Sequence, residues 1–157
     1  MTNSVRMFLP SPLQRRTLLR FCAAMAIGNL VWEMAHMPLY TLWQTGTRSE
    51  IAYAVIHCTL GDILIATACF GGAVSLLGRH GWPGRGYAKV AATTILMALC
   101  YTVFSEWLNV EIRGSWAYRD LMPRLPILGT GLSPVVQWLV VPCAAFWWAM
   151  RGIAEGS

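Results

Sequence analysis

Hydrophobic residues fill four long stretches of the chain, at about 18–42, 51–77, 90–109 and 132–150. A helix needs roughly 20 mostly apolar residues to cross a bilayer, and all four stretches reach about that length. Gly46, the glycine-rich 78–86 segment and the Pro/Gly-rich 114–134 segment separate the stretches, as turns would. The pattern predicts an all-α fold, an integral membrane four-helix bundle that forms one transmembrane domain over residues 1–157.

The composition agrees with a membrane protein. The chain is 56% hydrophobic and only 12% charged, about half the charged fraction of a typical soluble protein. A soluble helical domain with so little charge would expose large apolar patches. The net charge is +5, but the basic residues are scattered and form no stripe, so we expect no nucleic-acid partner. The five cysteines lie inside apolar runs without metal-ligand spacing, which predicts small packing residues rather than disulfides.

The distribution of Lys and Arg predicts the direction of the helices. The apolar run at 18–42 is too long for a signal peptide, so we expect it to remain as the first helix. Eight of the twelve Lys and Arg then lie on the side of the termini (Arg6, Arg15, Arg16, Arg20, Arg79, Arg85, Lys89, Arg151), against four on the other side (Arg48, Arg113, Arg119, Arg124). Because cytoplasmic segments carry the excess of positive charge, both termini are predicted to be cytoplasmic. The expected location is a bacterial inner membrane, with an outer loop at 110–131 in the periplasm of a Gram-negative host.

Small residues and short connections predict how these helices pack. The short connections make neighbouring helices antiparallel. Gly28, Gly61, Gly71 and Gly72 are expected to let helix backbones approach closely.

The outer segment at 110–134 mixes aromatic and aliphatic residues with five charges and three prolines. We expect an interfacial loop whose aromatic residues, including Trp116 and Tyr118, form a belt at the membrane surface. The alternative is a lid folded over a site between the helices.

Polar residues interrupt the apolar stretches on one side of the predicted bilayer. The stretch LVWEMAHMPLY at 30–40 carries two of them, and every helix contributes: Glu33 and His36, His57 and Asp62, Glu106 and Asn109, and Gln137. A rise of about 1.5 Å per residue places all of them in the outer half. Ionisable groups inside a membrane usually face the bundle interior and mark a functional site.

Helical spacing supports part of a common site. Glu33 and His36 are three residues apart and share a face, as do Glu106 and Asn109. His57 and Asp62 are about 140° apart around their helix, so both cannot point straight at one centre. We predict a catalytic cluster of the six ionisable or amide residues on the first three helices: Glu33, His36, His57, Asp62, Glu106 and Asn109.

Several chemistries fit this cluster. Metal ligation by His36, His57 and Glu33 would match the His₂Glu set of catalytic zinc, which activates water. Di-iron ligation needs a second Glu-x-x-His motif, and the third helix has Glu-x-x-Asn instead. Without a metal, Glu33 and His36 form a general acid/base pair. Haem b held by His36 and His57 is a further alternative.

The sequence therefore predicts a membrane-embedded enzyme with an outward-facing Glu/His/Asp site. The expected reaction is hydrolysis or group transfer on a lipid or lipid-linked molecule that enters from the outer leaflet. A small proton-coupled transporter, or a structural or haem-binding subunit of a membrane complex, are the alternatives. The architecture is also compatible with a homo-oligomer.

Overall fold

The chain folds entirely into helices and loops over residues 11–78, 81–126 and 128–154, which the computed structural model describes. Four long helices make up the bundle: α1 (Pro12–His36), α3 (Arg48–Ala73), α4 (Tyr87–Trp107) and α5 (Leu132–Ala154). Short helical turns extend three of them: η2 (Met37–Leu39), η3 (Val74–Gly78) and η4 (Leu108–Ile112). A one-turn helix, α2 (Leu42–Thr45), lies between α1 and α3.

Local sequence signals set where the helices begin and end. Ser11 caps α1 in a reciprocal capping box with Gln14, and Thr47 caps α3 in the same way with Glu50. The first apolar stretch was predicted to continue to residue 42, but α1 ends at His36. Pro38 explains the difference, because a proline has no N–H to donate to the carbonyl four residues earlier and its ring clashes with that carbonyl.

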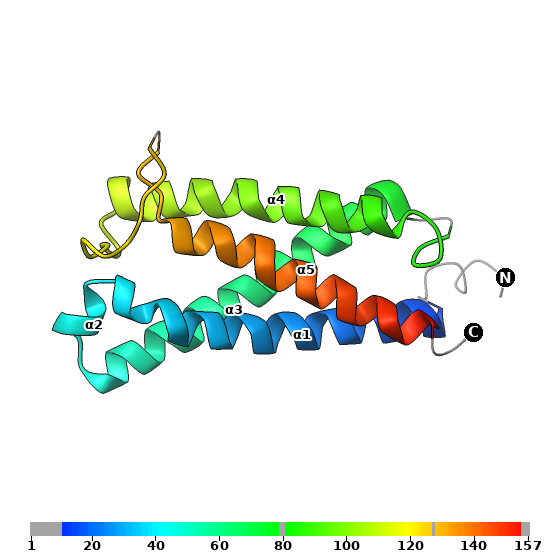
Figure 1. Ribbon diagram of the computed structural model, residues 1–157, viewed down its shortest axis with the longest axis horizontal. Coiled ribbons are helices and arrows are strands. Elements are labelled where there is room, and N and C mark those ends of the chain that lie inside the picture. Colours follow the sequence, from blue (N-terminus) through cyan, green and yellow to red (C-terminus); the bar gives the residue numbers. More distant parts are fainter. Residues whose placement is uncertain (1–10, 79–80, 127, 155–157) are drawn as a thin grey trace, which may run out of the picture.

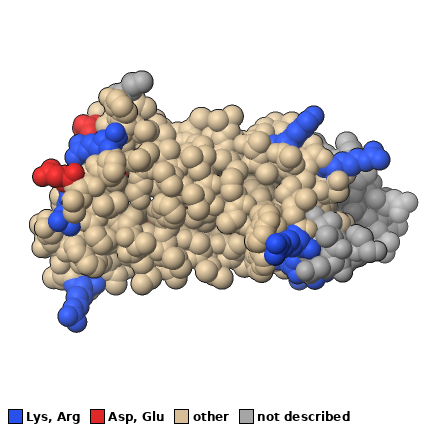
Figure 2. Space-filling view, in the orientation of Figure 1, with Lys and Arg blue, Asp and Glu red and all other residues tan. Residues whose placement is uncertain are grey.

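Within the described residues, four helical segments are long and apolar enough to cross a membrane: Pro12–Leu39, Arg48–Gly78, Tyr87–Ile112 and Leu132–Arg151. They match the four predicted stretches. Large apolar side chains such as Ile27, Leu64 and Val140 are at least half exposed. Figure 2 shows charged side chains gathered at the two ends of the molecule, with a belt free of charge between them. These features indicate an integral membrane protein and confirm the predicted all-helical bundle.

The two ends of the bundle differ in structure. The terminal end holds the start of α1 and the end of α5, and the loop end holds α2 and the 113–131 connection (Figure 1). Helix α3 runs diagonally through Figure 1, from beside α1 at the loop end to beside α4 at the terminal end. The diagonal course separates α3 from α4 at the loop end.

Aromatic side chains fill the terminal end. Phe21 of α1 stacks on Phe70 of α3, with ring centroids 4.7 Å apart, and meets Phe146 of α5 at 4.5 Å. Tyr87 of α4 donates a hydrogen bond to the backbone oxygen of Phe146. Trp82 also packs edge-on against Phe70. All four long helices are therefore joined here by one packed core.

Two of the four predicted close-contact glycines have that role. A Cβ at Gly28 would lie 2.7 Å from Cγ1 of Val141, so α1 and α5 need a glycine there. A Cβ at Gly72 would lie 3.3 Å from Cε of Met97 on α4. Gly61 and Gly71 have nothing within 4 Å of the Cβ position, so the prediction of close approach is wrong at these two residues.

Candidate functional site

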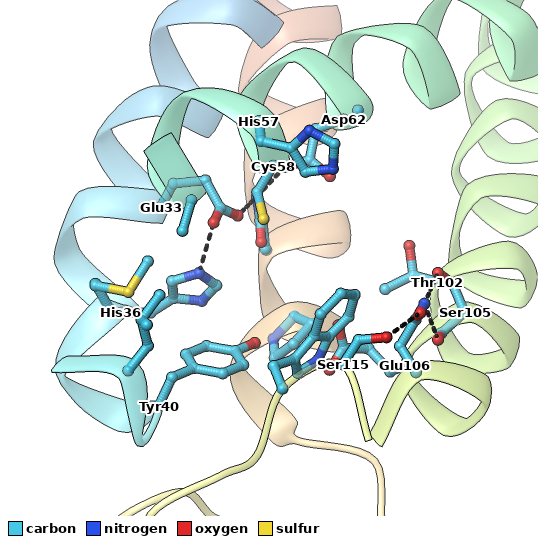
Figure 3. A pocket seen from close by; sticks show the side chains of 18 of the residues that line it. Glu33, His36, Tyr40, His57, Cys58, Asp62, Thr102, Ser105, Glu106 and Ser115 are labelled. Atoms are coloured by element: carbon cyan, nitrogen blue, oxygen red, sulfur yellow. Dashed lines mark hydrogen bonds and ion pairs between the residues drawn. The ribbon is translucent and has the colours of Figure 1, made fainter. Parts of the chain in front are cut away.

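A cavity of about 850 Å³ lies among the loop-end halves of the four long helices. Figure 3 shows polar side chains converging on it from separate elements: Glu33 and His36 from α1, Asp62 from α3, and Glu106 from α4. The six predicted catalytic residues all line this cavity. The packed aromatic core lies between the cavity and the terminal end. The structure therefore collects the predicted polar residues around one space.

Gln137 of α5 joins the polar residues of two other helices. Its side-chain Nε2 lies 2.8 Å from Oδ2 of Asp62, 3.2 Å from Oε1 of Glu33 and 3.2 Å from Oδ1 of Asn29. Gln137, Glu33 and Asn29 are all buried. An amide nitrogen can donate two hydrogen bonds, so these three oxygen atoms share two protons. The network links α1, α3 and α5 through buried polar groups.

A second chain of hydrogen bonds orients His36. Trp32 Nε1 lies 3.2 Å from Ser133 Oγ, and Ser133 Oγ lies 3.0 Å from His36 Nδ1. Nε2 of His36 lies 3.1 Å from Oε2 of Glu33. Because an indole nitrogen can only donate, one arrangement satisfies every group: Trp32 donates to Ser133, Ser133 to Nδ1, and Nε2–H to Glu33. Both carboxylate oxygens of Glu33 then accept a hydrogen bond, one from His36 and one from Gln137.

Glu106 stands on α4 and is held by the loop. Its Oε2 accepts hydrogen bonds from the Tyr118 hydroxyl and from Nε1 of Trp116, the latter at 3.5 Å. Burial raises the pKa of Tyr118, and the nearby Glu106 carboxylate raises this pKa further. The phenol therefore keeps its proton at neutral pH and remains a donor.

The loop at 113–131 is anchored to the chain after α1. Backbone hydrogen bonds run from Thr41 to Ala117 and from Arg119 to Leu39, both at 2.9 Å. The Tyr118 ring packs on Tyr40, with centroids 5.5 Å apart. The preferred prediction of an outward belt is thus wrong for Trp116 and Tyr118, because both side chains turn inward to Glu106. The alternative, a lid over the polar cluster, describes their placement.

Asn109 lies where the lid leaves α4. Its Nδ2 donates to the backbone oxygen of Ser105 at 2.8 Å, and its Oδ1 accepts from the Ser115 hydroxyl at 3.3 Å. The backbone oxygen of Asn109 also accepts from the nitrogen of Ser115. Both ends of the side-chain amide are occupied within this turn, so Asn109 positions the start of the lid.

His57 and Asp62 occupy different parts of the wall, as their angular separation predicted. Asp62 points to Gln137, whereas His57 is exposed and stacks on Tyr53 with ring centroids 5.5 Å apart. Among the described residues, no group of three or more His, Cys, Asp or Glu side chains is placed to hold a metal ion. The predicted ligand trio of His36, His57 and Glu33 is therefore not assembled in this structure. His36 is buried against Glu33 and Ser133, whereas His57 is exposed. Such different surroundings do not favour the alternative in which the two histidines hold a haem.

The cavity reaches the surface between α3 and α4, and the exposed residues Ser49 and Glu50 line it at the loop end as well. Its lining includes Tyr53 and His57 of α3 and Tyr101 of α4, all of them exposed on the outer surface. Tyr53 is 69% exposed and Tyr101 is 49% exposed. Both helices are apolar enough to span a membrane, so an opening between them faces the region where lipid chains would lie. Gly61 lines the same space.

Two residues of the polar network were missed by the sequence analysis. Asn29 lies four residues before Glu33, so it shares the face of α1 that carries Glu33 and His36, and this spacing could have revealed it. Ser133 stands at the start of α5 and gave no sequence signal, since serine is common at helix starts. Comparison of the chain with protein-family models, curated proteins and solved structures finds no match.

Proposed function

We propose that the chain is a membrane-embedded enzyme that hydrolyses, or transfers a group on, a lipid or lipid-linked molecule. The observation that carries the proposal is the oriented Glu33–His36 pair at the wall of a cavity with a lateral opening. A carboxylate held by two donors beside an imidazole is a suitable general base. The opening between α3 and α4 would admit a substrate directly from the bilayer. The loop end would face the outside, as the distribution of Lys and Arg predicts.

Glu33 and Glu106 have complementary roles in this proposal. Glu33 takes the proton of an attacking hydroxyl group, which belongs to water in hydrolysis or to a second substrate in transfer. The hydroxyl oxygen then forms the new bond as the bond to the leaving group breaks. Glu106 relays a proton from solvent or from an acidic group of the substrate to the leaving group, and the two carboxyl groups reset by proton exchange. The reaction needs no oxidant or reductant.

Supporting residues position these two carboxyl groups. His36 donates to Glu33 and is itself oriented by Ser133, so it favours the carboxylate form that accepts a proton. Trp116 and Tyr118 hold Glu106 from the lid. Asp62 shares the Gln137 amide with Glu33, so the two carboxyl groups lie on the same wall. A metal ion bound by His36 or His57 would need further ligands, because the described residues assemble no set of three His, Cys, Asp or Glu side chains around one point.

The packed core at the terminal end favours an enzyme over a transporter. A transported ion or solute would have to pass Phe21, Phe70 and Phe146, which pack together in the path from the cavity. An enzyme that takes its substrate from the bilayer and returns its product there needs one opening only.

The test compares lipid extracts of the native host by mass spectrometry. A strain lacking the gene receives the natural sequence, Glu33→Gln, His36→Ala or the lipid-facing control Leu30→Ala. The natural sequence and Leu30→Ala should restore a lipid species that the deletion strain lacks or reduce one that it accumulates. Glu33→Gln should insert normally and lower the turnover by about 10²–10⁴-fold, the usual contribution of a general base.

Two results would contradict the proposal. One is a full restoration of the lipid profile by Glu33→Gln at equal protein abundance. The other is a loss of folded protein in both site variants while the remaining molecules keep full function. The second result would identify Glu33 and His36 as contacts that hold the helices of a structural subunit together.

A further inference from the structure

We infer that the ligand of this cavity is a lipid-soluble organic cation, namely an apolar molecule with an ammonium group and no phosphate. The inference rests on the proposed function, because it names the substrate class of the same cavity. Charge, aromatic lining, an unpartnered hydroxyl and a lateral opening each contribute to it.

The charge of the lining has one sign. Four carboxyl side chains line the cavity, those of Glu33, Glu50, Asp62 and Glu106. None of the described residues that line it is Lys or Arg. The lid has three arginines, and none of them lines the cavity. Arg119 donates to the backbone oxygen of Pro38 at 2.7 Å, and Arg124 lies over the Tyr118 ring. A phosphate would therefore meet carboxylates without a Lys or Arg side chain to compensate its charge, and such like-charge contact is unfavourable.

Two carboxyl groups retain an oxygen that can receive a ligand. Glu33 uses both oxygens, toward His36 and Gln137. Asp62 has its contact to Gln137 through Oδ2, and Glu106 has its contacts to the lid through Oε2. Among the described residues, no N–H group donates to Oδ1 of Asp62 or to Oε1 of Glu106. An ammonium group between α3 and α4 would supply the donors that these two oxygens lack.

Thr102 provides an independent sign of a ligand. It lines the cavity on α4, is only 6% exposed, and its Oγ1 has no hydrogen-bond partner among the described residues. Figure 3 shows it one helical turn from Glu106, on the cavity wall. A buried hydroxyl without a partner is unfavourable by itself. A polar ligand held beside Glu106 would satisfy it.

Aromatic rings complete a cation site. Tyr40, Trp116 and Trp138 line the interior of the cavity, and Tyr53 and Tyr101 line its opening. The face of an aromatic ring attracts an ammonium ion, and this attraction strengthens when water is excluded. The same rings accept an apolar body, and the opening between α3 and α4 admits one from the bilayer. This combination suits an amine with a long apolar body better than a small polar cation, which would arrive from water.

The experiment measures binding without turnover. Protein in zwitterionic lipid nanodiscs is mixed with hexadecylamine, hexadecanol or hexadecyl phosphate at equal mole fraction. Bound ligand is counted by native mass spectrometry, and the unfolding temperature is recorded. The amine should bind and raise the unfolding temperature, while the alcohol binds more weakly and the phosphate least. Asp62→Asn and Glu106→Gln should each weaken amine binding by about tenfold or more, and Asp120→Asn, an exposed carboxyl variant outside the cavity, should not.

Two glycines of α3 provide a matched steric control. Gly61 and Gly71 both have nothing within 4 Å of the Cβ position, but only Gly61 lines the cavity. Gly61→Leu should fill the cavity and abolish amine binding, and Gly71→Leu should bind like the natural protein.

Equal binding of the alcohol or the phosphate would overturn the inference, as would amine binding that survives Gly61→Leu. Neither result depends on the reaction, because binding is measured without turnover. If the amine binds as expected but Glu33→Gln leaves the lipid profile unchanged, the cation site stands and the proposed enzymatic function fails. If Glu33→Gln removes activity but the natural protein prefers the alcohol, the function stands and the cation inference fails.

Discussion

Gln137 is the point at which three helices share buried polar groups. Its amide faces two carboxyl groups and the Asn29 side chain within 3.2 Å, in a region otherwise surrounded by apolar residues. A buried oxygen that loses its donor costs more free energy than the hydrogen bond itself contributes. The amide therefore stabilises the bundle as well as shaping the cavity wall.

Gln137→Leu removes this donor while keeping a side chain of similar size. We expect the free energy of unfolding to fall by about 2 kcal/mol, because the oxygens of Glu33 and Asp62 lose a shared partner. Unfolding by denaturing detergent, followed by circular dichroism, measures the change. Val140→Leu, on the exposed face of the same helix, is the control and should be neutral. A Gln137→Leu protein as stable as the natural one would show that the hydrogen-bond network does not contribute to the free energy of unfolding.

The sequence predicts the members of the site better than their partners. The three-residue spacing of Glu33 and His36 placed them on one face, and they do share a contact. The angular separation of His57 and Asp62 correctly indicated that they point to different places. The contact of Ser133 with His36 depends on how α5 is rotated against α1, and no spacing within one helix encodes that rotation.

At the scale of elements, the lid is the feature that sequence pattern could not resolve. Trp116 and Tyr118 suit a membrane interface and a packed lid equally well, because both environments favour an apolar ring with a polar tip. The choice is made by tertiary contacts: Glu106 accepts from both side chains, and the backbone of the lid pairs with residues 39–41. The boundaries of the four spans, in contrast, follow from apolar length alone and were predicted to within a few residues.

Tyr118→Phe should loosen the lid. Loss of a hydrogen bond to a carboxylate makes opening easier, so the backbone amides of Thr41 and Arg119, which bond across the lid, should exchange about tenfold faster. Hydrogen–deuterium exchange with mass spectrometry measures this rate. Tyr101→Phe on α4 is the matched control, because it removes the same hydroxyl from an exposed ring. Unchanged exchange in Tyr118→Phe would mean that the backbone pairing alone holds the lid.

The Tyr118 hydroxyl also determines how the lid is expected to respond to pH. Burial, and then the charge of Glu106, raises the pKa of Tyr118 in the closed lid. An open lid releases the phenol to water, where its pKa returns to about 10. The closed form thus holds the proton more tightly, so its stability is intact below about pH 10 and declines only as pH rises above that value. The lid is expected to stay closed through the neutral range.

The whole molecule is asymmetric along its long axis, with a packed core at the terminal end and a cavity at the loop end. The course of α3 explains both features. The diagonal course of α3 brings it against α4 at the terminal end, where aromatic rings interlock, and away from α4 at the loop end, where the cavity lies. A rigid core at one end can hold the polar side chains of the other in place. Substitutions in the aromatic core therefore act on the site only through the packing of the helices.

The direction of the bundle in the membrane is the prediction that belongs to this scale. Four spans place both termini on one side, and the larger share of Lys and Arg lies on that side, which predicts that it is the cytoplasmic side. Arg6 and Arg79 contribute to this count but lie outside the described residues. Arg20 and Arg151 remain close to the terminal end, where each lies over a tryptophan ring of α5.

Reporter fusions decide the direction. An alkaline phosphatase reporter should be active when it is inserted within residues 113–124 and inactive when fused after Arg151, and a fluorescent reporter that needs the cytoplasm should give the opposite pattern. The matched test removes positive charge from the side of the termini. Replacing Arg15, Arg16 and Arg20 by Gln should produce a fraction of molecules in the reverse direction. The same replacement at Arg113, Arg119 and Arg124 should leave the direction unchanged, because it increases the existing asymmetry. An active phosphatase at the C-terminus of the natural chain would reverse the assignment and place the cavity in the cytoplasmic leaflet.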